Sequence, residues 1–148
     1  MEYAILFLPL LGSIIGYCGK SLGNLFAEII TSFFTILSAI FSIIIFYNGF
    51  KNNEYGNYKI FEWVSSGNFI ANWSINIDPL SSIMLVVVTL VSSLVHIYSI
   101  GYMSHDPHKP RFMSYLSLFT FSMLALVVSD NFLQLFFGWE CVGLCSYL

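Results

Sequence analysis

Long stretches without a charged residue divide this chain, and they constrain its fold more than any other feature. A membrane helix needs about 20 mostly apolar residues to cross roughly 30 Å of hydrocarbon. Four charge-free intervals approach or exceed that length, and a fifth apolar stretch is interrupted only by Glu140. The pattern predicts an all-α integral membrane protein with about five transmembrane helices, over residues 3–19, 25–50, 79–103, 112–129 and 131–148.

Composition supports the same conclusion and excludes other classes of protein. Hydrophobic residues make up 57% of the chain and charged residues 9%, whereas a soluble domain carries about 25% charged residues. The net charge is -3 and no basic stripe is visible, so we expect no nucleic acid partner. The three cysteines have no zinc-ligand or disulfide spacing and are interpreted as small apolar packing residues: Cys18, Cys141 and Cys145.

The segment 51–78 is the one long polar interval, and it predicts an extramembrane loop between the second and third helices. Apolar side chains alternate along residues 69–77, and a Ser-Ser-Gly-Asn turn precedes them. Alternation of this kind is typical of a β-hairpin, whose Trp63 and Trp73 would suit a membrane interface. Asp78-Pro79 then predicts the start of the third helix, with Asp as N-cap and Pro at the first helical position.

The loops also suggest an orientation. Alternating spans put residues 18–24 and 104–111 on one side, with three Lys or Arg, and the hairpin loop on the other side, with two. The positive-inside rule places the first side in the cytoplasm or matrix. The loop 104–111 holds two His and an Asp, but its two prolines and the lack of further ligands favour a solvated turn over a metal site.

Glu140 is the leading candidate for a functional residue. It lies ten residues into the fifth predicted span, which is about 15 Å along a helix and therefore near the middle of the bilayer. A carboxylate there costs at least a few kcal/mol unless it has a partner or water, so it suits proton transfer. The alternative is a permanently protonated Glu that hydrogen-bonds a neighbouring helix. No Lys or Arg lies inside any predicted span, so a cationic partner must come from elsewhere.

Two other residues are candidates for a proton path. His96 lies eighteen residues after Asp78, near the inner boundary, where it could receive a proton; the favoured reading is an interfacial belt residue beside Tyr98 and Tyr102. Glu28 lies near the start of the second helix. There the favoured reading is a side chain that complements the helix N-terminus and reaches the interface.

Several motifs resemble a known family, the large antiporter-like membrane subunit of respiratory complex I, in its amino-terminal portion. The motifs are Asp78-Pro79-Leu80-Ser81-Ser82-Ile83-Met84, His96-Ile97-Tyr98-Ser99-Ile100-Gly101-Tyr102-Met103, Arg111-Phe112-Met113-Ser114-Tyr115-Leu116, Asp130-Asn131-Phe132 and Gly138-Trp139-Glu140-Cys141-Val142-Gly143-Leu144-Cys145-Ser146-Tyr147-Leu148. The resemblance covers the whole chain.

The resemblance implies a subunit of an NADH:quinone oxidoreductase, in which electron transfer from NADH to quinone drives proton pumping. It implies that Glu140 is the fifth-helix glutamate that the family pairs with a lysine on a later helix. The family usually has Gly after this Glu, whereas this chain has Cys141, which puts close helix contact there in doubt. No cofactor is expected in this chain, which lacks a nicotinamide fold, a flavin site and an iron-sulfur cysteine cluster. NADH, FMN, iron-sulfur clusters and quinone would be handled by other subunits.

Because family members are roughly four times longer, we expect this chain to be a fragment or one piece of a split subunit, with its last helix loosely held. Its expected partners are other complex I membrane subunits, the missing carboxy-terminal part and the lipid bilayer. The expected location is a bacterial cell membrane or the mitochondrial inner membrane. Two alternatives stay open: a subunit of a multisubunit cation/proton antiporter or membrane-bound hydrogenase, and a structural membrane scaffold.

Overall fold

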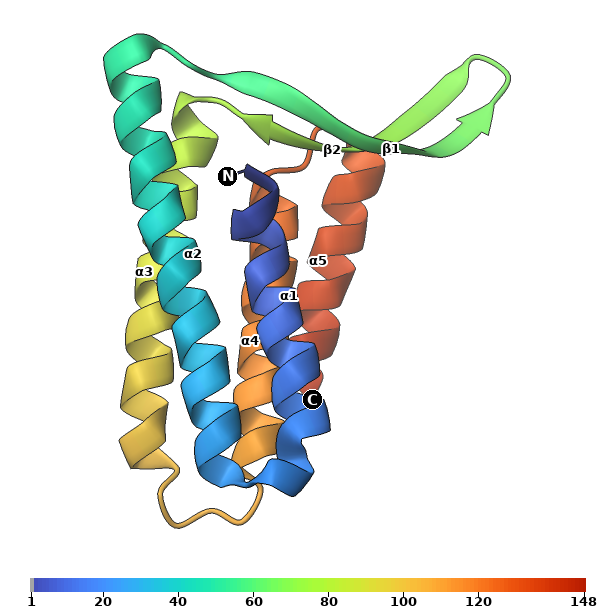
Figure 1. Ribbon diagram of the computed structural model, residues 1–148. Helices are drawn as coiled ribbons and strands as arrows, with labels where there is room; N and C mark the ends of the chain where they lie inside the picture. The colour runs from blue at the N-terminus through green and yellow to red at the C-terminus, as the bar shows by residue number, and fades with distance from the viewer. Residues whose placement is uncertain (1) are drawn as a thin grey trace.

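The computed structural model describes residues 2–148, apart from the side chain of Lys20. Five α-helices lie side by side, and a two-stranded antiparallel hairpin crosses one end of the bundle (Figure 1). The predicted number of helices and the hairpin are thus confirmed. The elements are α1 (Glu2–Cys18), a 3-10 turn η1 (Gly19–Leu22), α2 (Asn24–Asn52), β1 (Gly56–Ser66), β2 (Phe69–Ile77), α3 (Pro79–Tyr102), α4 (Lys109–Val127) and α5 (Phe132–Tyr147).

Three of the helices, α2, α3 and α4, are long and apolar enough to cross a membrane by length and composition. α1 has 17 residues and α5 has 16. The distribution of side chains is the reverse of that in a soluble bundle, because many large Ile, Leu, Phe and Val side chains are exposed while Ser and Thr line the helix contacts. Small hydroxyl residues allow close approach of helices in a bilayer, where the lipid covers the apolar surface.

Hydroxyl side chains also repair the break that Pro9 makes inside α1. Proline has no N–H, so the carbonyl of Ile5 loses its helical hydrogen bond. The Ser38 hydroxyl on α2 donates to that carbonyl at 2.9 Å, and Ser117 on α4 donates to the carbonyl of Pro9 at 2.6 Å. The helix therefore continues through Pro9 to Cys18, held against α2 and α4 by hydrogen bonds to its main chain.

The start of α3 is as predicted from Asp78-Pro79. The Asp78 side chain accepts a hydrogen bond from the Ser81 N–H at 2.7 Å, and proline occupies the first turn. Farther along α3, the Thr89 hydroxyl hydrogen-bonds that of Ser42 on α2 at 2.7 Å. The antiparallel pair α2–α3 is thereby joined at its middle.

The hairpin has the predicted turn. Strands β1 and β2 pair from Gly56 opposite Ile77 to Ser66 opposite Phe69, with two irregularities in β1. The two-residue turn begins at Gly67, whose φ of +57° favours glycine, and a two-residue loop of this kind suits the twist of the flanking strands. At the far end of the hairpin, the Tyr3 ring of α1 packs edge-on against the Tyr58 ring.

Candidate functional site

Glu140 lies in the middle of α5, on the side of that helix turned away from the bundle. Its side chain is exposed, and no hydrogen bond or ion pair joins it to any residue that the structure describes. The surrounding exposed face is otherwise apolar and aromatic, with Phe136 at 61% exposure and Trp139 at 68%. One carboxylate therefore stands alone on an apolar helix face that none of the described residues covers.

The opposite side of α5 packs against α4, mainly through small residues. At Gly138 the two backbones approach so closely that a Cβ would lie 2.8 Å from the Leu126 Cα. Two turns later, the Cys145 Sγ is 3.6 Å from the Ser122 hydroxyl. Cys141 is half-buried on the same side, so the close contact between helices is made by Gly138, one turn before the position where the family usually has glycine.

The cysteines differ in their surroundings. Cys145 is buried and Cys141 is half-buried, as expected of packing residues, but Cys18 is exposed at the end of α1. The packing interpretation is therefore wrong for Cys18. Among the residues that the structure describes, no group of three or more His, Cys, Asp or Glu could hold a metal ion.

The start of α5 is bound to the outer edge of β2. Gln134 is fully buried; its Nε2 donates to the Ser74 carbonyl at 2.8 Å, and its Oε1 accepts from the Ser74 N–H at 3.3 Å. The Asn131 Nδ2 donates to the Asn72 carbonyl at 2.8 Å, and its Oδ1 caps α5 by accepting from the Gln134 N–H at 2.8 Å. These contacts satisfy a strand edge that would otherwise be open for pairing.

Two further hydrogen bonds complete this attachment, which we call the hairpin clamp: the contacts of Val128, Asp130, Asn131 and Gln134 with residues 72, 74 and 76. The Asn76 N–H donates to the Val128 carbonyl at 2.9 Å, and the Ser74 hydroxyl donates to Asp130 at 3.0 Å. The expectation of a loosely held last helix is therefore wrong for the first half of α5, because the clamp fixes that end.

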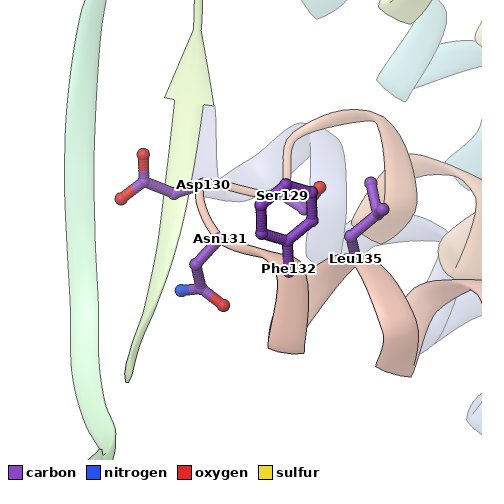
Figure 2. Close-up of a pocket in the computed structure, with 5 residues that line it drawn as sticks. All are labelled: Ser129, Asp130, Asn131, Phe132 and Leu135. Carbon is purple, nitrogen blue, oxygen red and sulfur yellow. The ribbon is translucent and has the colours of Figure 1, made fainter. Parts of the chain in front are cut away.

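Aromatic rings and a shallow depression border the clamp. The Phe137 ring of α5 packs edge-on against Trp73 at 4.8 Å and against Trp63 at 5.8 Å between centroids, so both tryptophans contact α5. The depression lies over the α4–α5 turn. Figure 2 shows Asp130 and Asn131 on the side of β2, with Phe132 and Leu135 on the other side of the turn.

His96 is not exposed as an interfacial belt residue would be, so that prediction is wrong. It is completely buried in the bundle, whereas Tyr98 and Tyr102 are 67% and 70% exposed. Tyr98 and Tyr102 share the opposite face of α3, where their rings stack, because the helix turns 100° per residue. The His96 Nδ1 donates to the Ser92 carbonyl at 2.7 Å, while its Nε2 has no hydrogen-bond partner among the described residues. The Ser92 hydroxyl in turn bonds that of Thr120 on α4.

Glu28 also differs from its favoured reading. Its side chain is buried instead of reaching the interface, and the Lys109 Nζ lies 2.8 Å from its Oε1. A buried carboxylate needs a cation or hydrogen bonds to offset its lost hydration, and the start of α4 supplies one. The loop before α4 is a turn in which the His108 N–H donates to Asp106.

The structure does not join the three candidate residues into one site. Glu28, His96 and Glu140 belong to α2, α3 and α5, and no hydrogen bond or ion pair connects any two of them within residues 2–148. The hairpin clamp was not predicted. Its one visible trace in the sequence is an Asn-Phe-Leu-Gln run directly after Asp130, which is consistent with an N-cap but does not reveal what Gln134 contacts.

Comparison with known proteins identifies the family. A family model for the N-terminus of chain 5 of NADH-ubiquinone oxidoreductase (complex I) matches residues 63–113. NADH-ubiquinone oxidoreductase chain 5 of Phytophthora infestans is 56% identical over 146 residues, covering 97% of this chain and 22% of the relative. The chain belongs to the complex I chain 5 and subunit L family.

Relatives in this family come from both mitochondria and bacteria. Chain 5 of Arabidopsis thaliana is 53% identical over 149 residues, which is the whole of this chain and 22% of the relative. NADH-quinone oxidoreductase subunit L of Rickettsia felis is 54% identical over 145 residues, which is 97% of this chain and 22% of the relative. The chain thus spans about a fifth of the length of these chain 5 and subunit L proteins, and like them it is an integral membrane protein.

Proposed function

We propose that this chain serves as the amino-terminal part of a proton-translocating membrane subunit of an NADH:quinone oxidoreductase. The reaction would couple electron transfer from NADH to quinone to the movement of protons across the membrane. Support comes from identities above 50% along the chain to proteins named for this oxidoreductase. The redox chemistry would belong to other subunits that hold NADH, FMN, iron-sulfur clusters and quinone.

All five helices would cross the membrane in this proposal, over about 3–19, 25–50, 79–103, 112–129 and 131–148, with loop 51–78 outside. The helices α1 and α5 are about 24 to 26 Å long at 1.5 Å per residue, slightly less than the hydrocarbon thickness. Local thinning of the bilayer accommodates such a mismatch at modest cost. Large apolar side chains are exposed along both helices, which favours burial in lipid or against further helices.

The observation that carries the proposed mechanism is the place of Glu140 on the uncovered face of α5. It is the ninth residue of the helix, about 12 Å from the helix start, and its neighbours on that face are apolar. A carboxylate in such a place needs a cation, a proton or water. We infer that a lysine from the rest of the subunit pairs with Glu140, and that Glu140 takes up a proton when the pair separates.

His96 and Glu28 are candidates for a second segment of the path. A neutral His96 that donates through Nδ1 leaves Nε2 as an acceptor, and the buried Nε2 could accept a hydrogen bond from a water molecule. The Ser92–Thr120 hydroxyl pair extends this polar position from α3 to α4. The Glu28–Lys109 pair joins the first turns of α2 to the start of α4, at the end of the bundle where a proton would enter or leave.

The test of the mechanism is Glu140→Gln in the full-length subunit assembled in its native membrane, with Glu62→Gln on the exposed hairpin as the matched control. We expect the Glu140 variant to lose most of the protons pumped per NADH oxidised, and the control to keep them. Normal pumping by the Glu140 variant would contradict the mechanism. It would support the alternative of a structural scaffold, in which the Glu140 side chain only packs.

The partners would be other complex I membrane subunits, the remainder of the same subunit and lipid, in a bacterial cell membrane or the mitochondrial inner membrane. A related possibility is a multisubunit cation/proton antiporter or a membrane-bound hydrogenase. Purification of the tagged subunit separates these possibilities. Recovery of an NADH-oxidising assembly supports complex I, and recovery of membrane subunits without that activity contradicts it.

A further inference from the structure

We propose that Gln134 is a positioning residue that sets the axial position and rotation of α5, and thereby aims Glu140. This inference rests on the proposed role of Glu140 and adds a residue that the motif around Glu140 does not contain. Gln134 lies six residues before Glu140 on the same helix, about 9 Å along the axis and on a different side.

Gln134 has the contacts that this role needs. Its amide bonds both the N–H and the carbonyl of Ser74, at 3.3 and 2.8 Å. Two hydrogen bonds from one rigid amide to one residue restrict rotation as well as distance. Both Gln134 and Ser74 are buried, with 0% and 1% of their surface exposed, so water cannot replace these bonds without opening the contact.

The clamp acts together with the other contacts of α5. α5 packs against α4 and the hairpin, so one of its faces has no neighbour among residues 2–148. Gly138 approaches Leu126 closely, and Phe137 packs against Trp63 and Trp73, but these contacts are not directional hydrogen bonds to the strand main chain, as those of Gln134 are. Asn131, which caps α5 and bonds the Asn72 carbonyl, acts together with Gln134 from the adjacent turn.

The position of the hairpin consequently determines the position of Glu140, the proposed proton-transfer residue. Strand β2 is fixed to the end of α4 by the Asn76–Val128 hydrogen bond and to the start of α5 by Gln134. A displacement of β2 would move α5 with it. Since α5 carries Glu140 on a rigid helix, the distance from Glu140 to a lysine on another element would change in the same step.

The test replaces Gln134 by methionine, which keeps the length of the side chain and removes both hydrogen bonds. The matched control is Thr89→Val, which removes the buried α2–α3 hydrogen bond to Ser42. The Thr89 side chain makes no hydrogen bond to α5. Both variants are made in the full-length subunit within its native complex. The readouts are the rate at which dicyclohexylcarbodiimide labels Glu140 and the protons pumped per NADH.

We expect the Gln134 variant to label at Glu140 at least about threefold faster than wild type, because loss of two buried hydrogen bonds frees the helix and a carboxyl without its cation is more often protonated. Its pumping ratio should fall, while both readouts stay at the wild-type value in Thr89→Val. Asn131→Ser is a milder second variant, because serine can still cap the helix and the substitution removes the donor to Asn72 without adding a charge. It should change both readouts in the same direction by less.

Wild-type labelling in Gln134→Met, or an equal change in Thr89→Val, would overturn the positioning role. These outcomes are separable from failure of the proposed mechanism. If Glu140→Gln pumps normally, the mechanism is wrong, and the labelling rates still decide whether Gln134 positions α5. If Glu140→Gln stops pumping and Gln134→Met labels and pumps as wild type, only the positioning role is wrong.

Discussion

Gly138 gives the sharpest test of how α5 packs. In Gly138→Ala the new Cβ would lie 2.8 Å from the Leu126 Cα and N, whereas carbon atoms pack at about 3.5 to 4.0 Å. The helices α4 and α5 must therefore separate locally by about 0.7 to 1.2 Å. Overpacking of this kind costs about 1 to 3 kcal/mol, while alanine in place of glycine favours a helix by about 1 kcal/mol.

Gly143→Ala is the matched control, because a Cβ at Gly143 meets no atom within 4 Å and lies in the same helix. The helix-propensity gain is then common to both variants and cancels in their difference. We expect Gly138→Ala to be less stable than Gly143→Ala by about 1 to 3 kcal/mol. The measurement is reversible unfolding of the chain in mixed detergent micelles. Equal free energies of unfolding for the two alanine variants would show that α5 does not approach α4 as closely as described.

Two further predictions concern the capped start of α3 and the buried ion pair. Asp78→Ala should lower the free energy of unfolding by about 1 kcal/mol and speed amide exchange at Ser81, while Asp78→Asn keeps the cap; equal exchange in all three proteins contradicts this. Lys109→Met should cost about 3 to 5 kcal/mol because it leaves Glu28 buried without a cation. The double substitution with Glu28→Gln should cost less than Lys109→Met alone, and a strictly additive result in this double-mutant cycle would contradict the pairing.

Much of the fold could be predicted because it depends on local patterns. Charge-free stretches mark the helices, Asp78-Pro79 marks a helix start through main-chain hydrogen bonding, and alternation before Ile77 marks a strand. Each of these patterns lies within about 25 consecutive residues. The prediction of the hairpin also used a turn, Gly67-Asn68, whose conformation favours glycine at its first position.

The site could be predicted only in part, because it depends on which side of a helix each residue faces and on contacts between distant segments. His96 looked interfacial from its distance along α3, but its rotation turns it into the bundle. Glu28 meets Lys109 across 81 positions of sequence. Gln134 meets Ser74 across 60 positions and bonds its main chain. Any residue except proline at position 74 has these main-chain groups, so the identity of that residue does not reveal the contact.

The most direct test of proton transfer by Glu140 follows its protonation during turnover. Infrared difference spectra of the membrane-embedded complex, recorded with and without NADH, report the carbonyl stretch of protonated carboxyl groups. If Glu140 transfers protons, a band changes on addition of NADH in the wild type and is missing in Glu140→Gln. A spectrum in which every such band persists in Glu140→Gln would contradict it, because Glu140 would then neither gain nor lose a proton as the enzyme works.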